Sequence, residues 1–328
     1  MPVKIREGLP AADVLAAENV FVMTDRRAAS QDIRPLSILV LNLMPTKQTT
    51  EAQILRLLGN SPLQVEVTFL HTASYSPRHT DHTHLEVFYE TFERIRDERF
   101  DGLIITGAPV ELMEFEEVDY WDELVGIMDW ADEHVFSTLA ICWGAQAELY
   151  HHYGIGKHTV DEKVFGVFRH VVTDPKNKIT RGFDDTFMAP HSRHTTVDVA
   201  DIEAEPDLEL LAVSPEVGVY LAASRDGRRV FVTGHAEYDA DTLDQEYRRD
   251  VAADLPISIP VNYYPDDDPQ QAPSVTWRSH GDLLFTNWLN YCVYQETPYD
   301  LHELVAREHG PADRSVTAAT HGGGSAPR

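Results

Sequence analysis

The sequence predicts an α/β fold, in which a parallel sheet flanked by helices is followed by a partly antiparallel C-terminal portion. Apolar runs of strand length alternate with segments of helical spacing between residues 36 and 151. This order is typical of βαβ units and therefore of a parallel sheet. From about residue 160 the apolar runs become short and closely connected, which favours antiparallel strands.

The first half of the chain supplies the predicted parallel sheet. After an N-terminal arm of residues 1–35, which holds a short strand at residues 20–23, four strands are expected at residues 36–43, 63–70, 100–109 and 136–141. Helices are expected at residues 49–58, 85–96, 118–133 and 145–151, with a polar loop at residues 72–84. Sites in open sheets lie at the carboxyl ends of the strands, where Lys47, Gly107 and Cys142 follow.

The second half supplies the antiparallel portion. Short strands are expected at residues 165–172, 195–199, 209–214, 217–224 and 229–233, with a hairpin turn at residues 224–227 (Ser-Arg-Asp-Gly). Helices are expected at residues 241–254 and 281–295, on either side of a loop at residues 256–273 rich in proline and aspartate. The main domain is thus predicted to cover residues 36–305, and the Gly-containing end, residues 306–328, to be a disordered tail.

Charge and composition exclude several classes of protein. With 27 Lys and Arg against 54 Asp and Glu in 328 residues, the net charge is −27, which disfavours nucleic acid as a partner. Such an acidic chain is better tolerated in a salt-rich cytoplasm, where ions screen its self-repulsion. No apolar run approaches the roughly 20 residues of a membrane span, and the N-terminus has no apolar signal core. A cytoplasmic protein without membrane contact is expected.

The two cysteines, Cys142 and Cys292, predict neither a disulfide framework nor a zinc site. The His-containing stretch at residues 79–84 lies in a predicted polar loop, so no metal centre is expected there. Cys142 is the more informative of the two, because an apolar run ends at it and a helix-forming segment follows at once. A strand, a sharp turn and a helix would expose its side chain to backbone N–H groups and a helix N-terminus, which favour a reactive thiolate. Taken alone, the stretch fits a buried structural cysteine equally well.

Two segments together resemble the class I glutamine amidotransferase-like (flavodoxin-like) fold, which carries a Cys–His–Glu triad. They are residues 141–144 (Ile-Cys-Trp-Gly) and 233–237 (Thr-Gly-His-Ala-Glu). Further matches are residues 41–47 (Leu-Asn-Leu-Met-Pro-Thr-Lys), residues 106–109 (Thr-Gly-Ala-Pro), Trp121, residues 190–193 (Pro-His-Ser-Arg) and residues 231–238. They narrow the resemblance, over about residues 1–305, to the homoserine O-acyltransferases of methionine biosynthesis.

The resemblance implies a role for seven residues. Cys142 would carry the acyl group as a thioester, His235 would be the general base, and Glu237 would complete the triad. The positions expected to contact the substrate are Lys163, Ser192 and Arg249, and Glu111 would govern the choice of acyl-CoA. The resemblance also implies a homodimer, with L-homoserine and acetyl-CoA as substrates and no further cofactor.

Physical reasoning agrees with these roles but leaves alternatives open. A thiol suits acyl transfer because the acyl group arrives on sulfur and remains a thioester. His235 and Glu237 would point to the same side of a strand, and backbone N–H groups at Trp143 and Ala108 could stabilise the oxyanion. From the residues alone, His235 could also be a core histidine, and Glu237 and Arg249 could be solvated side chains.

Glu111 follows the third predicted strand, so it is expected near Cys142. A carboxylate there would repel the terminal carboxylate of a succinyl group by about 1–4 kcal/mol at about 4 Å, which favours acetyl-CoA as donor. Alternatively, Glu111 is one more acid on a solvated loop. Three other functions remain open: a homoserine O-succinyltransferase, a glutaminase-like cysteine hydrolase that uses the same triad, and a non-catalytic binding protein on the same fold.

Overall fold

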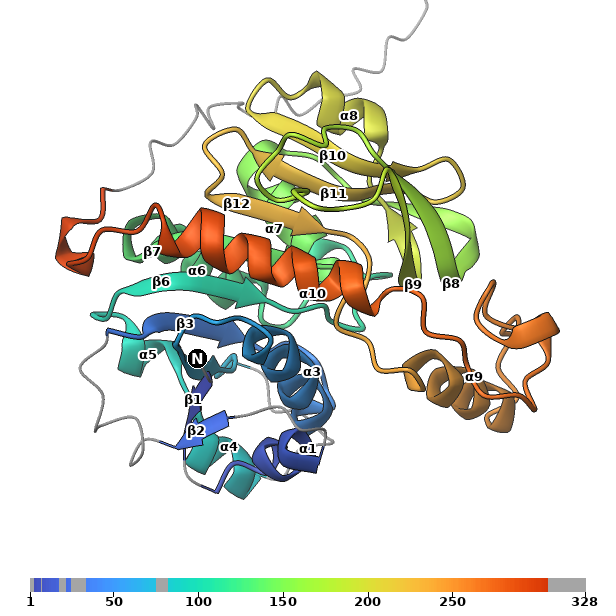
Figure 1. The fold of residues 1–328 in the computed structure, drawn as a ribbon, viewed down its shortest axis with the longest axis horizontal. Coiled ribbons are helices and arrows are strands. Elements are labelled where there is room, and N and C mark those ends of the chain that lie inside the picture. Colours follow the sequence, from blue (N-terminus) through green and yellow to red (C-terminus); the bar gives the residue numbers. More distant parts are fainter. Residues whose placement is uncertain (1–2, 7, 18–21, 25–33, 75–81, 306–328) are drawn as a thin grey trace, which may run out of the picture.

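The computed structural model describes residues 3–6, 8–17, 22–24, 34–74 and 82–305. The predicted disordered tail lies outside these residues, as does the first half of the stretch 79–84, whereas residues 82–84 begin a helix. Within the described residues a single sheet of twelve strands organises the molecule, in the order β2-β1-β4-β3-β6-β7-β12-β11-β10-β8-β9, with β5 pairing with β4 (Figure 1). No helix among them is long and apolar enough to cross a membrane.

The first part of the sheet is parallel, as the sequence predicted. Its strands are β1 (Val3–Ile5), β2 (Val22–Thr24), β3 (Leu36–Leu41), β4 (Val65–Leu70), β5 (Tyr89–Glu90), β6 (Phe100–Ile105), β7 (Val135–Ile141) and β12 (Arg229–Val232). The residues assigned to an N-terminal arm supply β1 and β2, which extend the sheet beside β4.

The second part is antiparallel, which also agrees with the prediction. Its strands are β8 (His158–Val172), β9 (Thr186–Thr196), β10 (Leu208–Ser214) and β11 (Gly218–Ser224). The chain then returns as β12 between β7 and β11, parallel to the former and antiparallel to the latter. β12 therefore joins the two parts at the centre of the sheet, beside the strand that precedes Cys142.

Helices cover both faces of the parallel part, since its strands are apolar on both sides. In β3, Ile38 and Val40 belong to one buried cluster, whereas Leu39 and Leu41 belong to the other. The first cluster includes side chains of α1 (Ala11–Ala17), α3 (Lys47–Gly59), α10 (Arg278–Asn287) and the π-helix Trp288–Tyr294. The second includes α6 (Trp121–His134), α7 (Trp143–Tyr153) and α8 (Val199–Ala204). In Figure 1, α10 crosses in front of the central strands, and α6 and α7 lie behind them.

The predicted helix at residues 85–96 is wrong. The segment divides into α4 (His82–Phe88), the short strand β5 and α5 (Phe92–Ile95). Tyr89 pairs with Phe69 of β4 and donates its buried hydroxyl to Glu51 at 2.8 Å. This tertiary contact outweighs the helical spacing of the sequence.

The predicted strand at residues 195–199 is also wrong, because β9 begins at Thr186, ends at Thr196 and is followed by α8 from Val199. Pro190 lies within β9, and proline usually disfavours a strand because it cannot donate to the ladder. It is accommodated because β9 is the last strand at one edge of the sheet. The helix α9 (Thr242–Ala252) follows β12 and lies near the end of β9 and β8 in Figure 1.

Candidate active site

A cavity of about 450 Å³ lies where β6 and β7 end. Most of the site residues predicted from the sequence line it, although they come from distant parts of the chain: Ala108, Glu111, Cys142, Lys163, Ser192, His235 and Arg249. The two others adjoin lining residues: Trp143 follows Cys142 in the chain, and Glu237 is hydrogen-bonded to His235. The structure thus brings the predicted site residues together.

Cys142 stands at a sharp turn between β7 and α7. Its backbone has a φ of 50° and a ψ of −116°, a conformation that L-residues rarely adopt. Its N–H donates to the carbonyl of Val232 in β12 at 2.7 Å, so the strand pairing holds this residue in place. The turn also requires Gly144, because a β-carbon there would lie 2.6 Å from the carbonyl oxygen of Thr106. The sulfur is therefore fixed at the N-terminus of α7, where backbone N–H groups face it.

His235 and Glu237 follow β12 and form a close pair. His235 Nδ1 lies 2.7 Å from Glu237 Oε1, which leaves Nε2 for Cys142, whose side chain is also a hydrogen-bond partner of His235. The His235 ring stacks on Tyr238, with ring centroids 4.0 Å apart, and its backbone N–H donates to Pro190 at 2.9 Å. Burial alone lowers the pKa of His235, but the charges and hydrogen bonds of Cys142 and Glu237 raise it well above its ordinary value. The arrangement favours a thiolate–imidazolium pair.

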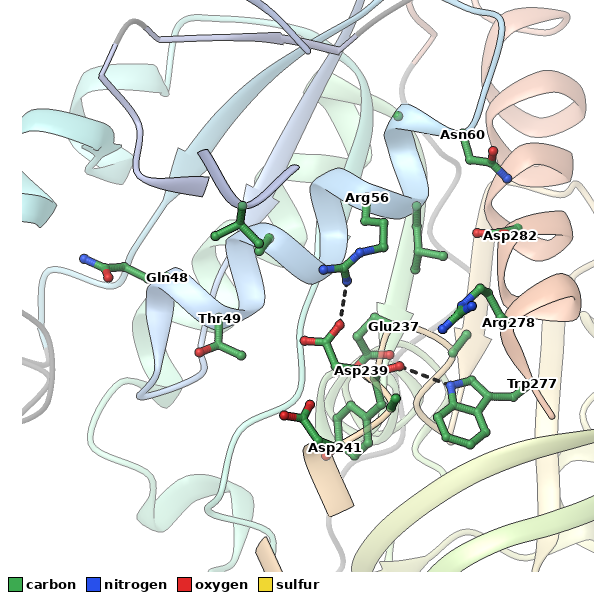
Figure 2. Close-up of a pocket in the computed structure, with 17 residues that line it drawn as sticks. Gln48, Thr49, Arg56, Asn60, Glu237, Asp239, Asp241, Trp277, Arg278 and Asp282 are labelled. Carbon is green, nitrogen blue, oxygen red and sulfur yellow. Dashed lines mark hydrogen bonds and ion pairs between the residues drawn. The ribbon is translucent and has the colours of Figure 1, made fainter. Parts of the chain in front are cut away.

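Glu237 lines a second cavity, of about 1040 Å³, together with residues of α3 and α10 (Figure 2). Beside it, Asp239 pairs with Arg56 of α3 at 2.7 Å, and the indole of Trp277 donates to the carbonyl of Tyr238 at 3.1 Å. Figure 2 draws both of these contacts. They hold the segment after His235 on both sides, so the carboxylate that orients the imidazole is itself fixed.

The three predicted substrate contacts converge on a residue that the sequence analysis missed, Glu246 of α9. Its carboxylate lies 2.5 Å from Lys163 Nζ, 2.8 Å from Ser192 Oγ and 3.7 Å from Arg249 Nη2. Lys163 and Ser192 come from the neighbouring strands β8 and β9. The only signal in the sequence is the spacing of three residues between Glu246 and Arg249, which places both on one face of a helix. The cluster presents an anion and two cations within one wall of the cavity.

The oxyanion candidates are also at the cavity. Trp143 is the first residue of α7, so its N–H has no acceptor within the helix. Its indole is fully buried against Phe115 and Tyr120, which fixes the backbone. Ala108 follows Gly107 in the turn after β6 and lines the cavity. Both N–H groups therefore belong to the two turns that meet beside Cys142.

Glu111 lies on the same wall as Ala108, three residues further along the chain. Its carboxylate lies 3.5 Å from the hydroxyl of Thr195 in β9, so it is anchored to the sheet at the cavity. In the described part of the chain, no three His, Cys, Asp or Glu side chains are grouped closely enough to hold a metal ion.

Comparison with known proteins identifies the family to which the chain is similar. Residues 2–299 match the family model described as homoserine O-succinyltransferase. A protein of Brevibacillus brevis named homoserine O-acetyltransferase is 60% identical, with 92% of this chain and 99% of that protein covered. A protein of the same name from Geobacillus kaustophilus is 61% identical, over 92% and 99%. The corresponding protein of Acetivibrio thermocellus is 59% identical, over 93% and 100%.

Solved structures are similar in fold at low sequence identity. The protein SMU.1228c superimposes with a TM-score of 0.53 at 15% identity, with 78% of this chain and 99% of that chain covered. A glutamine amidotransferase from Thermotoga maritima gives a TM-score of 0.49 at 11% identity, over 79% and 98%. The first of these likenesses concerns the α/β fold alone.

Proposed function

This chain belongs to the homoserine O-succinyltransferase family, and we propose on that premise that it transfers an acetyl group from acetyl-CoA to the hydroxyl of L-homoserine. One observation carries the proposal: Cys142 and His235 line a single cavity, and His235 Nδ1 lies 2.7 Å from Glu237 Oε1. The names of the relatives support acetyl rather than succinyl transfer, as does the carboxylate of Glu111 in the cavity wall. The product would be O-acetyl-L-homoserine.

In the first half-reaction, the Cys142 thiolate attacks the thioester carbonyl of acetyl-CoA. The C–S bond to CoA breaks, and the departing sulfur takes the proton of the His235 imidazolium. The acetyl group is then a thioester on Cys142 and His235 is neutral. Splitting the transfer in this way replaces one direct attack of a weakly nucleophilic alcohol on acetyl-CoA by two easier steps. The acceptor then needs to bind only after CoA has left.

In the second half-reaction, neutral His235 takes the proton of the homoserine hydroxyl as the oxygen attacks the acetyl-Cys142 carbonyl. The C–S bond to Cys142 breaks, which restores the thiolate–imidazolium pair. Glu237 holds the ring through Nδ1 and stabilises its charge in both steps. Each tetrahedral intermediate places an oxyanion near the N–H groups of Trp143 and Ala108, which would stabilise it without reorganising.

The Glu246 cluster suits the two charged groups of the acceptor. An α-amino acid carries an ammonium and a carboxylate, and the cluster offers the Glu246 carboxylate beside Lys163 and Arg249. The ammonium would pair with Glu246, and the carboxylate with the guanidinium of Arg249, whose planar fork matches it. Ser192 would complete the contact from β9. This orientation leaves the homoserine side chain free to extend toward Cys142.

Parallel initial rates with acetyl-CoA and succinyl-CoA, each with and without L-homoserine, test the proposal. CoA release that depends on homoserine and is much faster with acetyl-CoA is expected, together with loss of activity in Cys142→Ala. Release with succinyl-CoA at an equal or higher rate would assign the chain to succinyl transfer. Glutamine hydrolysis without acyl transfer would instead favour a cysteine hydrolase. That the protein is a homodimer and that it lies in the cytoplasm both stay predictions. Size-exclusion chromatography with light scattering tests the first of them.

A further inference from the structure

Arg193 carries a positive charge that is buried beneath the candidate active site without a carboxylate partner. It lies on β9 next to Ser192 but on the opposite face, and is only 1% exposed. Its guanidinium donates to the carbonyls of Thr195, at 2.7 Å, and Val217, and its Nε donates to His191 Nδ1 at 3.3 Å. All three acceptors are neutral, and no ion pair to Arg193 is recorded among the described residues. Buried charges are normally paired, so the charge of Arg193 requires an explanation.

The neighbouring imidazoles do not share this charge or neutralise it. His191 accepts from Arg193 at Nδ1, so its proton is on Nε2, which lies 3.0 Å from His170 Nε2. Burial lowers the pKa of His170 to about 3, and burial together with the charge of Arg193 lowers the pKa of His191 well below its ordinary value. Both rings are therefore neutral at physiological pH. They fix the orientation of the guanidinium and leave one positive charge in place.

The opposite charges that act on Arg193 are those of Cys142 and Glu111. Burial lowers the pKa of Arg193, whereas Cys142 and Glu111 raise it. Thr195, whose carbonyl binds the guanidinium, connects the same two residues. Its hydroxyl lies 3.5 Å from Glu111 Oε2 and 3.0 Å from the side-chain oxygen of Gln146, whose backbone N–H donates to the Cys142 carbonyl at 3.1 Å.

We propose that Arg193 is a positioning residue, whose fixed buried charge favours the thiolate of Cys142 and attracts the carboxylate of Glu111. The inference rests on the proposed role of Cys142 as nucleophile. When the acetyl group is on Cys142, the thiolate charge is gone and Glu111 is the remaining anion that faces Arg193. Arg193 therefore attracts the Glu111 carboxylate at the stage where a succinyl group would have to fit.

Alkylation of Cys142 by iodoacetamide in substrate-free protein, followed by peptide mass spectrometry across pH, reports the thiolate directly. Arg193→Gln retains donors for the two carbonyls but removes the charge. Its alkylation midpoint is expected to move up by about one pH unit or more, which is about tenfold less thiolate at lower pH. Arg169→Gln, on the exposed face of the neighbouring strand β8, changes the net charge equally and is expected to leave the midpoint unchanged.

Arg193→Lys separates charge from structure. It retains the charge but loses the planar fork, so its melting temperature is expected to fall while its midpoint stays within about half a pH unit of wild type. A folded Arg193→Gln with the wild-type midpoint would overturn the proposal. If Arg193→Gln does not fold, the proposal would be overturned by Arg193→Lys instead, should that variant have both a lower melting temperature and a higher alkylation midpoint than wild type. The proposed function fails by a different result, namely if Cys142→Ala still transfers acetyl groups. That result would not change the alkylation midpoints of the Arg193 variants.

Discussion

Gly107 lies so close to Cys142 that a β-carbon at position 107 would be 3.3 Å from the Cys142 β-carbon and 3.7 Å from His235 Cε1. The missing side chain keeps open the space between the candidate nucleophile and base. We expect Gly107→Ala to displace one of them by a few tenths of an ångström and to lower kcat about 10- to 100-fold, because acyl transfer depends on their alignment. CoA release with saturating acetyl-CoA and homoserine measures this.

Gly126 of α6 provides a matched control, since a β-carbon there meets nothing within 4 Å. Gly126→Ala should leave kcat unchanged and raise the free energy of unfolding by about 0.5–1 kcal/mol, the usual gain for alanine over glycine within a helix. Wild-type kcat in a folded Gly107→Ala would show that the contact with Cys142 has no catalytic consequence.

The His235–Glu237 contact predicts unequal losses in the two variants. His235→Asn removes the base and should lower kcat about 10²–10⁴-fold, whereas Glu237→Gln keeps a polar group beside Nδ1 and should cost less. Glu237→Gln should also lower the pKa of His235, because the carboxylate charge helps to raise it. A histidine NMR titration, in which the signal missing from His235→Asn identifies the ring, measures that pKa. An unchanged pKa together with full activity would make Glu237 a bystander.

The sequence predicts the Cys142 turn well because its signals are local. An apolar strand, a cysteine and small residues before a helix suffice to place the thiol at the edge of a parallel sheet, and β7 and α7 confirm this. Local signals fail where a tertiary contact decides. Pro190 argues against β9 in the sequence, yet its carbonyl accepts the N–H of His235 in the structure. Likewise, Glu246 is one acid among many until β8 and β9 bring Lys163 and Ser192 to it.

The two cysteines should differ in reactivity. Burial raises the pKa of Cys292 to about 12, and its side chain is only 3% exposed. Native protein should therefore incorporate one iodoacetamide per chain at pH 8, at Cys142, and two after denaturation. Labelling of Cys292 at a comparable rate in native protein would contradict its burial.

Cys292 also predicts a pH dependence of stability. Below pH 9 its thiol is protonated in both states; between pH 9 and about 12 the unfolded chain loses the proton and the native state retains it. The free energy of unfolding should therefore fall as pH rises above 9, by up to about 1.4 kcal/mol per unit for this group. Cys292→Ala should reduce that slope relative to wild type in urea unfolding. Equal slopes for the two proteins would rule out this contribution.

The net charge of −27 predicts stabilisation by salt. Screening of self-repulsion should raise the melting temperature as KCl increases from low to molar concentrations. The same titration near the isoelectric pH is the control, because little net charge remains to be screened there. A melting temperature that is flat or falls with KCl at neutral pH would remove the expectation of a salt-rich cytoplasm.

Glu111 predicts the choice of acyl donor. Its carboxylate lines the cavity that holds Cys142, and a succinyl group would bring a second carboxylate there. Two carboxylates about 4 Å apart repel by about 1 kcal/mol in water and about 4 kcal/mol at an effective dielectric near 20. Such energies change a rate ratio by about 5- to 1000-fold. Glu111→Gly should therefore raise kcat/KM for succinyl-CoA relative to acetyl-CoA by at least about fivefold.

Glu114 is the control for this prediction, because it belongs to the same acidic run but is exposed and does not line the cavity. Glu114→Gly removes the same charge from the same loop and should leave the donor ratio unchanged, so a shift confined to Glu111→Gly cannot come from net charge. If instead both variants shift the ratio equally, the long-range field of the loop selects the donor. If neither does, selection lies elsewhere in the cavity, and Glu111 loses the role that its position beside Cys142 suggests.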